Sequence, residues 1–178
     1  AIAFGRGPGA FTGLRTSCAV AQGLALGSGR PVLAIDSLQL VAEQARTRAG
    51  AGPLDLGVVM DARMGELYAA RWRWDGSGWQ TLHEPRLCSP QALAEAWAES
   101  PPQACTGSGR PLAQDVFRQR WGHGHWIDEG DDRAGALLQL ARQAWHEGRM
   151  QDAAEALPVY VRDKVALTTA ERAAQGAR

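Results

Sequence analysis

The chain has 178 residues and is 45% hydrophobic, enough for one full domain or two small lobes with a packed core. It has 19 basic and 19 acidic residues, so no net charge favours nucleic acid or a membrane surface as a direct partner. The cysteines, Cys18, Cys88 and Cys105, are odd in number and widely spaced, which argues against a disulfide framework and favours a reducing compartment. No run approaches the roughly 20 apolar residues of a membrane span, and the opening residues lack a signal pattern, so we expect a cytoplasmic protein.

Residues 1–50 predict two strands and two helices. Residues 1–4 form a short apolar run that predicts a strand, and the glycines within residues 5–9 predict a turn with positive φ. Residues 11–26 have helical spacing and many small side chains, so the helix is thin and another backbone can approach it closely. A strand over residues 32–35 leads to Asp36, which suits the N-cap of a second helix, with Gln39 completing a capping-box pattern.

The pattern changes after residues 50–53. Residues 56–60, 66–74 and 79–82 predict an antiparallel meander, with a turn at 61–65, because residues 66–74 alternate with a period of two. Ser89 caps a predicted helix that runs to residue 97, a strand follows at 103–106, and residues 111–121 predict another helix. Asp131 and Asp132 open a last helix that ends near Gly148. Its predicted buried face carries Leu137, Leu138, Ala141, Ala144 and Trp145.

The glycine turn invites comparison with a dinucleotide-binding loop. Gly5-x-Gly7-x-x-Ala10 follows a strand and opens a helix, and the second strand ends in an acid, Asp36. Against this interpretation, Pro8 removes an amide donor, Asp36 suits a helix cap, and a meander follows in place of further βα units. A P-loop is excluded, because the chain has no Gly-Lys-Ser/Thr triplet.

The only cluster that resembles a metal site is His123-Gly-His125 with the acidic residues that follow it. A catalytic zinc site needs a third fixed ligand and an open position, and the sequence offers no clear third ligand. Carboxylates at a helix N-terminus, where the helix dipole favours them, explain the same residues. We therefore predict no bound metal.

Nucleophilic and acid–base sites are equally weakly indicated. Ser108, between two glycines, lacks the spacing of a nucleophile elbow, and Cys18 lies where a helix needs a small core residue. Asp61 and Glu66 flank the predicted hairpin turn and could form a carboxylate pair, but turn formation and solvation at a strand edge explain both. The sequence therefore predicts no catalytic residue and no cofactor.

Four segments together resemble the TsaB (YeaZ) family. They are residues 7–15 (Gly-Pro-Gly-Ala-Phe-Thr-Gly-Leu-Arg), 21–25 (Ala-Gln-Gly-Leu-Ala), 61–68 (Asp-Ala-Arg-Met-Gly-Glu-Leu-Tyr) and 158–162 (Pro-Val-Tyr-Val-Arg). The resemblance implies an α/β protein of the actin-like ATPase superfold, also called ASKHA or ribonuclease H-like. Residues 1–50 would be the remainder of an N-terminal lobe with the dimerisation helices, and residues 51–178 a C-terminal lobe.

The same resemblance implies a role in forming N6-threonylcarbamoyladenosine in tRNA. Members of the family are non-catalytic paralogues of TsaD and serve as a scaffold that supports it, and the His-x-Glu-x-His metal motif of TsaD is absent from this sequence. The expected partners are a TsaD-like catalytic subunit and a TsaE-like ATPase, with a second copy of the chain as a further candidate and tRNA bound only through the complex. The alternative is a nucleotide-binding or hydrolytic, peptidase-like enzyme of the same superfold.

The helix after the glycine turn belongs to the dimer surface of the family. The residues expected to contact a partner are Phe11, Thr12, Gly13, Leu14, Arg15, Ser17, Cys18 and Ala21. Family members have a strand, a turn and a further strand upstream of the glycine turn, so we expect an incomplete N-terminal lobe with an exposed edge at residues 1–4. Either a longer protein or dimerisation would complete that lobe.

Overall fold

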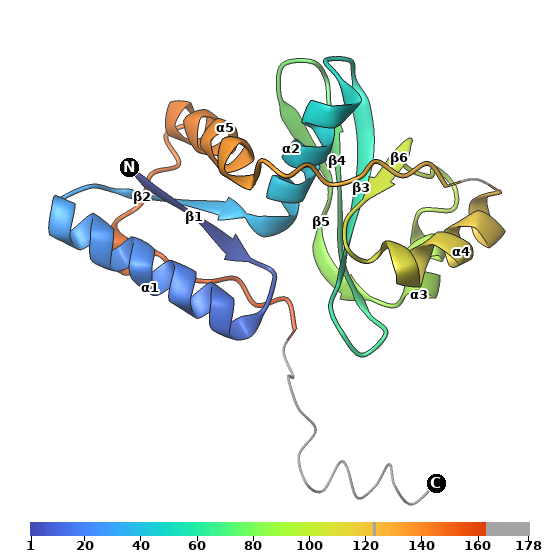
Figure 1. Cartoon of the computed structure of the whole chain (residues 1–178), viewed down its shortest axis with the longest axis horizontal. Coiled ribbons are helices and arrows are strands. Elements are labelled where there is room, and N and C mark those ends of the chain that lie inside the picture. Colours follow the sequence, from blue (N-terminus) through green and yellow to red (C-terminus); the bar gives the residue numbers. More distant parts are fainter. Residues whose placement is uncertain (123, 163–178) are drawn as a thin grey trace, which may run out of the picture.

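The computed structural model describes residues 1–122 and 124–162, which form two sheets and their covering helices (Figure 1). One sheet pairs β1 (Ile2–Gly7) with β2 (Val32–Asp36), and the other has the order β5-β4-β3-β6, built from β3 (Leu54–Asp61), β4 (Leu67–Trp74), β5 (Trp79–Cys88) and β6 (Ala104–Thr106). The helices are α1 (Phe11–Ser28), α2 (Ser37–Ala49), α3 (Pro90–Ala96), α4 (Arg110–Trp121) and α5 (Arg133–His146), followed by the 3-10 turn η1 (Ala153–Glu155).

The first sheet is parallel, and its two faces are covered by α1 and α5 (Figure 1). On one face, Cys18, Ala21 and Ala25 of α1 pack against Phe4 and Val32. The opposite face supplies a separate cluster that joins the two sheet residues Leu33 and Ile35 to Leu140 and Ala144 of α5. Small side chains at the α1 contact allow this helix to lie close to the sheet.

Strand β1 is longer than the sequence predicts. Pairing with β2 continues to Gly7, opposite Asp36, with a register shift between Gly5 and Gly7. The predicted turn is therefore shorter, and of the glycines at 5, 7 and 9 only Gly7 has a positive φ, 116°. The apolar run ends at Phe4, but backbone pairing between strands does not require apolar side chains. The strand predicted from hydrophobicity is therefore too short.

The second sheet has a core on each face. Leu56, Val58 and Trp72 contact α2, with Tyr68 and Trp74 beside them, so the predicted aromatic face of residues 66–74 is confirmed. The other face packs against α3 and α4, where the aromatic side chains are Trp97, Phe117, Trp121 and Trp126.

Strand β5 was predicted to end at residue 82 and instead runs to Cys88. Cys88 pairs with Leu67, and two irregularities in the register interrupt the ladder near Arg71. The residues that were missed include His83, which pairs with Arg71, and Glu84 and Pro85, which lie at the irregularity without a partner in the ladder; such a polar run gives no strand pattern.

The predicted helix caps are confirmed at three helices. Asp36 Oδ1 accepts hydrogen bonds from the amides of Leu38 and Gln39 at 2.8 and 3.2 Å. Ser89 caps α3 in the same way, accepting from the Ala92 amide at 3.2 Å, and Asp132 caps α5. Because a cap acts within three residues, local sequence is enough to predict it.

The face of α5 differs from the prediction. Ala141 and Ala144 are buried as expected, but Leu138 and Trp145 are 58% and 46% exposed. The helix turns Ala136 and Leu140 inward instead, toward β2 and α2. A broad apolar stripe identifies a helix without identifying which part of the stripe its neighbours cover.

Helix α2 lies between the two sheets. Its Val41 belongs to the core of the second sheet, whereas Leu40 belongs to the cluster of α5 and the first sheet. Helix α5 and η1, both from the later part of the chain, pack with the first sheet. Because elements from both sides of residue 50 pack together, the predicted division into two lobes at residue 50 stays a prediction. Among the described residues, none of the helices combines the length and apolar character of a membrane span.

Candidate functional site: a groove beside the open edge of β1

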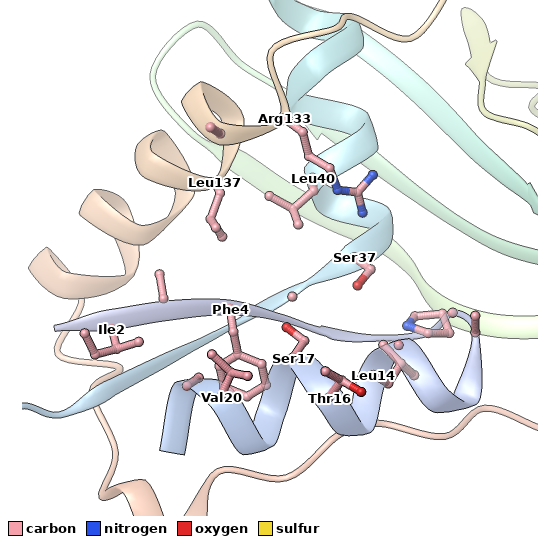
Figure 2. A pocket seen from close by; sticks show the side chains of 18 of the residues that line it. Ile2, Phe4, Leu14, Thr16, Ser17, Val20, Ser37, Leu40, Arg133 and Leu137 are labelled. Atoms are coloured by element: carbon pink, nitrogen blue, oxygen red, sulfur yellow. The ribbon is translucent and has the colours of Figure 1, made fainter. Parts of the chain in front are cut away.

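A groove of about 750 Å³ runs along β1, with α1 on one side and α2 and α5 on the other (Figure 2). Helix α1 lines it with Gly13, Ser17, Val20 and Leu24, whose spacing places them in one row along the helix. Leu137 of α5 points into the groove from the opposite side (Figure 2). Val20 and Leu24 are 55% and 57% exposed, so this groove presents apolar surface to a ligand or partner.

The backbone of β1 adds polar groups to the same groove. Within the described residues, β1 is hydrogen-bonded to β2 on one side and has no strand on the other. This is the exposed edge that the sequence predicts at residues 1–4, where the family that it resembles has further strands upstream, so the edge is not counted as a binding feature. The binding features of the groove are therefore its apolar side chains.

The eight residues predicted to contact a partner lie in different environments. Leu14, Cys18 and Ala21 are buried on the inner face of α1, against the rest of the chain. Cys18 Sγ donates to the carbonyl of Ala156 at 3.2 Å, and burial raises the pKa of its thiol. These three side chains support α1, and although little of them is exposed, Leu14 and Ala21 still contribute to the lining of the groove.

Gly13 and Ser17 line the groove, and Thr12 lies nearby on the exposed surface. A Cβ at Gly13 would meet no heavy atom within 4 Å, and the same holds for Gly23 and Gly27. The thin outline of α1 therefore lies on its outer side, where a second backbone has room to approach.

Phe11 and Arg15 lie on the opposite flank of α1. The Arg15 guanidinium is 3.8 Å from the centroid of the Phe11 ring, and its Nε donates to Tyr160 Oη at 3.0 Å. The rings of Phe11 and Tyr160 have centroids 5.1 Å apart. This stack joins the start of α1 to the end of the described chain.

Sequence reasoning missed Val20, Leu24 and Arg133 as groove residues. Val20 and Leu24 fall outside the apolar stripe of α1, and large apolar residues outside a buried stripe are a signal that was available. Arg133 comes from α5, about 120 residues later, so no local pattern could place it beside α1.

The glycine turn is explained by contacts within the fold. The Gly7 amide donates to Ser37 Oγ at 3.0 Å, and a Cβ at Gly7 would come within 2.6 Å of the Val159 carbonyl oxygen. The carboxylate of Asp36 is used as the cap of α2, and burial raises its pKa although the cap hydrogen bonds lower it. The residues that resemble a dinucleotide fingerprint thus have structural roles.

The other candidate sites also resolve into structural contacts. Asp61 Oδ1 accepts from the Arg63 amide at 2.7 Å, whereas Glu66 pairs with Arg162 at 2.7 Å. Ser108 Oγ accepts from the Asp61 amide at 3.2 Å. His123 of the candidate metal cluster lies outside the described residues, and within them no group of three or more metal-ligating side chains occurs.

The fold and groove define the class of protein. Residues 1–114 match the family model described as TsaD, tRNA N6-adenosine threonylcarbamoyltransferase. Two structures from Pseudomonas aeruginosa are similar, each at 33% identity: YeaZ, with a TM-score of 0.73 over 89% of this chain and 72% of that one, and a protein described as similar to peptidase YEAZ, with a TM-score of 0.71 over 90% and 72%. The chain is therefore an α/β protein of the TsaD/YeaZ type, consistent with the actin-like ATPase superfold.

Relatives identify the particular family. TsaB of Escherichia coli (strain K12), a tRNA threonylcarbamoyladenosine biosynthesis protein, is 33% identical over 171 residues, which are 93% of this chain and 72% of TsaB. TsaB of Haemophilus influenzae (strain ATCC 51907 / DSM 11121 / KW20 / Rd) is 32% identical over 174 residues, 93% of this chain and 71% of that protein. The chain belongs to the TsaB family, as the four sequence segments predicted.

Proposed function

We propose that this chain is a scaffold subunit in the biosynthesis of N6-threonylcarbamoyladenosine in tRNA. It binds a TsaD-like catalytic subunit and has no turnover of its own. The observation that carries the proposal is the exposed apolar row of α1, on a chain whose relatives are named as biosynthesis proteins of this modification.

The carboxylates that could act as catalytic groups already have structural hydrogen-bond or ion-pair partners, which supports a non-catalytic role. Asp36, Asp61 and Glu66 are committed to a cap, a turn and an ion pair, and burial raises the pKa of Cys105 to about 12. A thiol with so high a pKa is not a nucleophile near neutral pH. A TsaE-like ATPase would join the complex, tRNA would be reached only through the catalytic subunit, and the assembly would work in the cytoplasm, where tRNA is modified.

The outer side of α1 is the proposed contact surface. Fully burying a Val or Leu side chain contributes about 1.5 to 3 kcal/mol, and Val20 and Leu24 each have about half of that surface left to bury. The open space at Gly13 and Gly23 lets a partner helix approach closely. A second copy of the chain could use the same row, which makes a homodimer the alternative occupant.

Charge placed on this row tests the contact surface. Leu24→Arg and Gly13→Arg are expected to abolish co-purification with the TsaD-like subunit, because each adds a bulky cation to the proposed contact. Leu26→Arg is the matched control, since Leu26 is 70% exposed on the same helix but does not line the groove. Retention of the partner by all three variants would refute the assignment of this surface.

Reconstitution tests the scaffold role itself. The modification of tRNA should require this chain, and the chain alone should show no turnover. Calorimetry with ATP and magnesium distinguishes the alternative, a nucleotide-binding or hydrolytic enzyme. Micromolar binding of ATP by the isolated chain would favour that alternative over the scaffold.

A further inference from the structure

A second cavity, of about 430 Å³, lies between three segments that are far apart in the sequence. They are residues 8–14 at the start of α1, the end of β3 with the β3–β4 turn, and residues 159–162. Its apolar wall includes Leu14, Met60, Met64, Val159 and Tyr160. The cavity adjoins the groove of the proposed function, with which it shares Leu14, Met60 and residues 8–10, and extends from them to the β3–β4 turn and residues 159–162.

The walls are tied to one another, so the cavity exists before any ligand enters. The Val159 amide donates to the Arg6 carbonyl at 2.7 Å, which joins residues 159–162 to β1. Arg162 donates to the Ala62 carbonyl at 3.0 Å and pairs with Glu66 at 2.7 Å, which joins the same segment to the turn. A preformed site avoids part of the entropic cost of ordering on binding.

The β3–β4 turn shapes the mouth of the cavity. Arg63 and Met64 have φ values of 66° and 57°, in the left-handed region that costs a non-glycine residue about 1 to 2 kcal/mol. This conformation leaves Met64 76% exposed at the cavity, although its side chain is apolar. Methionine is flexible and polarizable, so Met60 and Met64 can adapt to side chains of different shape.

The charge at the rim is positive and incompletely neutralised. Arg63 pairs with Asp61, and Arg162 pairs with Glu66. Arg15 lies beside the cavity, stacked on Phe11 and hydrogen-bonded through its Nε to Tyr160, which both line the cavity, and within the described residues no carboxylate lies within 4 Å of it. The two terminal nitrogens of Arg15 can therefore receive a carboxylate in the bidentate geometry that guanidinium groups favour.

We propose that this cavity binds an acidic peptide segment of a partner protein. One apolar side chain of the segment enters between Met60 and Met64, and a neighbouring carboxylate pairs with Arg15. The volume lies within the range for ligand sites, so the cavity has room for an apolar side chain together with the backbone that carries it. The proposal goes beyond the scaffold function, because it assigns a second binding site on the other flank of α1, adjoining the groove, and gives the chemistry of its ligand.

Methionine methyl signals provide a direct test, because the chain has three methionines. Met60 and Met64 line the cavity, whereas Met150 lies elsewhere, beside the end of α1, and serves as an internal control. The full chain, labelled with ¹³C at the methionine methyl groups, is titrated with acetyl-Glu-Leu-Glu-amide. We expect the signals of Met60 and Met64 to shift and that of Met150 to stay.

Matched probes and variants separate the anchor from the charge. Acetyl-Lys-Leu-Lys-amide should bind at least about fivefold more weakly, and acetyl-Glu-Gly-Glu-amide should not shift the two methionines. Arg15→Gln should weaken binding of the acidic peptide about three- to tenfold, whereas Arg118→Gln, a change at an exposed arginine on α4, should not.

Three results would overturn the proposal. The first is equal binding of the acidic and basic peptides. The second is no shift of the Met60 and Met64 signals at about 10 mM peptide, a concentration far above a useful dissociation constant. The third is a shift of these two signals when no peptide is present and only the protein concentration or the length of the chain is changed. A shift on dilution of the protein would show that a second copy fills the cavity. A shift on removal of residues 163–178 would show that the chain itself fills it. None of these measurements uses the TsaD-like subunit, so they stand apart from the test of the scaffold function.

Discussion

Gly57→Ala is expected to destabilise the protein, although alanine is preferred to glycine inside a strand. Gly57 is a buried residue of β3, and a Cβ there would lie 2.7 Å from Trp97 Cζ3 and 3.1 Å from Pro102 Cγ. Trp97 is 1% exposed, and its indole nitrogen donates to His83 Nδ1 at 2.5 Å. The ring therefore cannot move aside without breaking this hydrogen bond and disturbing its aromatic neighbours.

The net effect follows from two opposing terms. Overpacking a core by one methyl group costs about 1 to 3 kcal/mol. Removing the conformational freedom of glycine contributes about 0.5 to 1 kcal/mol in the other direction. We therefore expect the free energy of unfolding to fall by about 1 to 2 kcal/mol, which lowers Tm by about 2 to 4 °C for each kcal/mol in a chain of this size.

Urea denaturation followed by far-UV circular dichroism measures this loss. Gly23→Ala in α1 is the matched control, because a Cβ there meets nothing within 4 Å, and it should stabilise the helix by about 0.5 to 1 kcal/mol. In a Trp97→Leu background the penalty of Gly57→Ala should largely disappear, since the clashing ring is gone. A Gly57→Ala protein as stable as the wild type, with an unchanged m-value, would refute the reasoning.

Three further predictions concern polar groups in the fold. Burial depresses the pKa of His83 below its usual 6.5, so the unfolded chain takes up a proton at a higher pH than the folded chain does. The free energy of unfolding should therefore fall as the pH is lowered below 6.5, and in urea titrations His83→Gln should flatten this fall. Asp55→Ala should cost about 3 to 5 kcal/mol in the same assay, because it leaves the buried Arg71 guanidinium without its carboxylate, which lies 2.6 Å away in the wild type. Asp36→Ala should cost about 1 kcal/mol through loss of the α2 cap, and Asp36→Ser should recover most of it; equal stability of the two variants would contradict the capping role.

Much of the fold was predicted from residues that are close together in the sequence. Asp36, Ser89 and Asp132 were recognised as caps because the amides that they accept from lie within three residues. The aromatic face of β4 followed from a period of two. By contrast, the end of β5 was missed because the mostly polar residues from His83 to Arg86 interrupt the hydrophobic pattern, although the strand pairs with β4 again from Arg86 to Cys88.

The candidate site was predictable only in part. The helix that lines the groove was identified, and so were Gly13 and Ser17. Leu14 and Ala21 also line the groove although both are largely buried, whereas Cys18 is buried and does not line it. The row completed by Val20 and Leu24 was missed, because periodicity shows that a helix has two faces without showing what covers each of them.

The sequence by itself determined three properties. A helix with many small side chains follows the glycine turn, the helices begin at predictable residues, and the chain belongs to a recognisable family. These properties depend on neighbouring residues or on motifs read in order. Only the tertiary structure decided which side of α1 is outward, because the inner side is covered by β1 and by residues that return from more than 120 positions later, such as Ala153 and Ala156. The cavity beside Arg15 has the same origin, since its walls meet only after the whole described chain has folded.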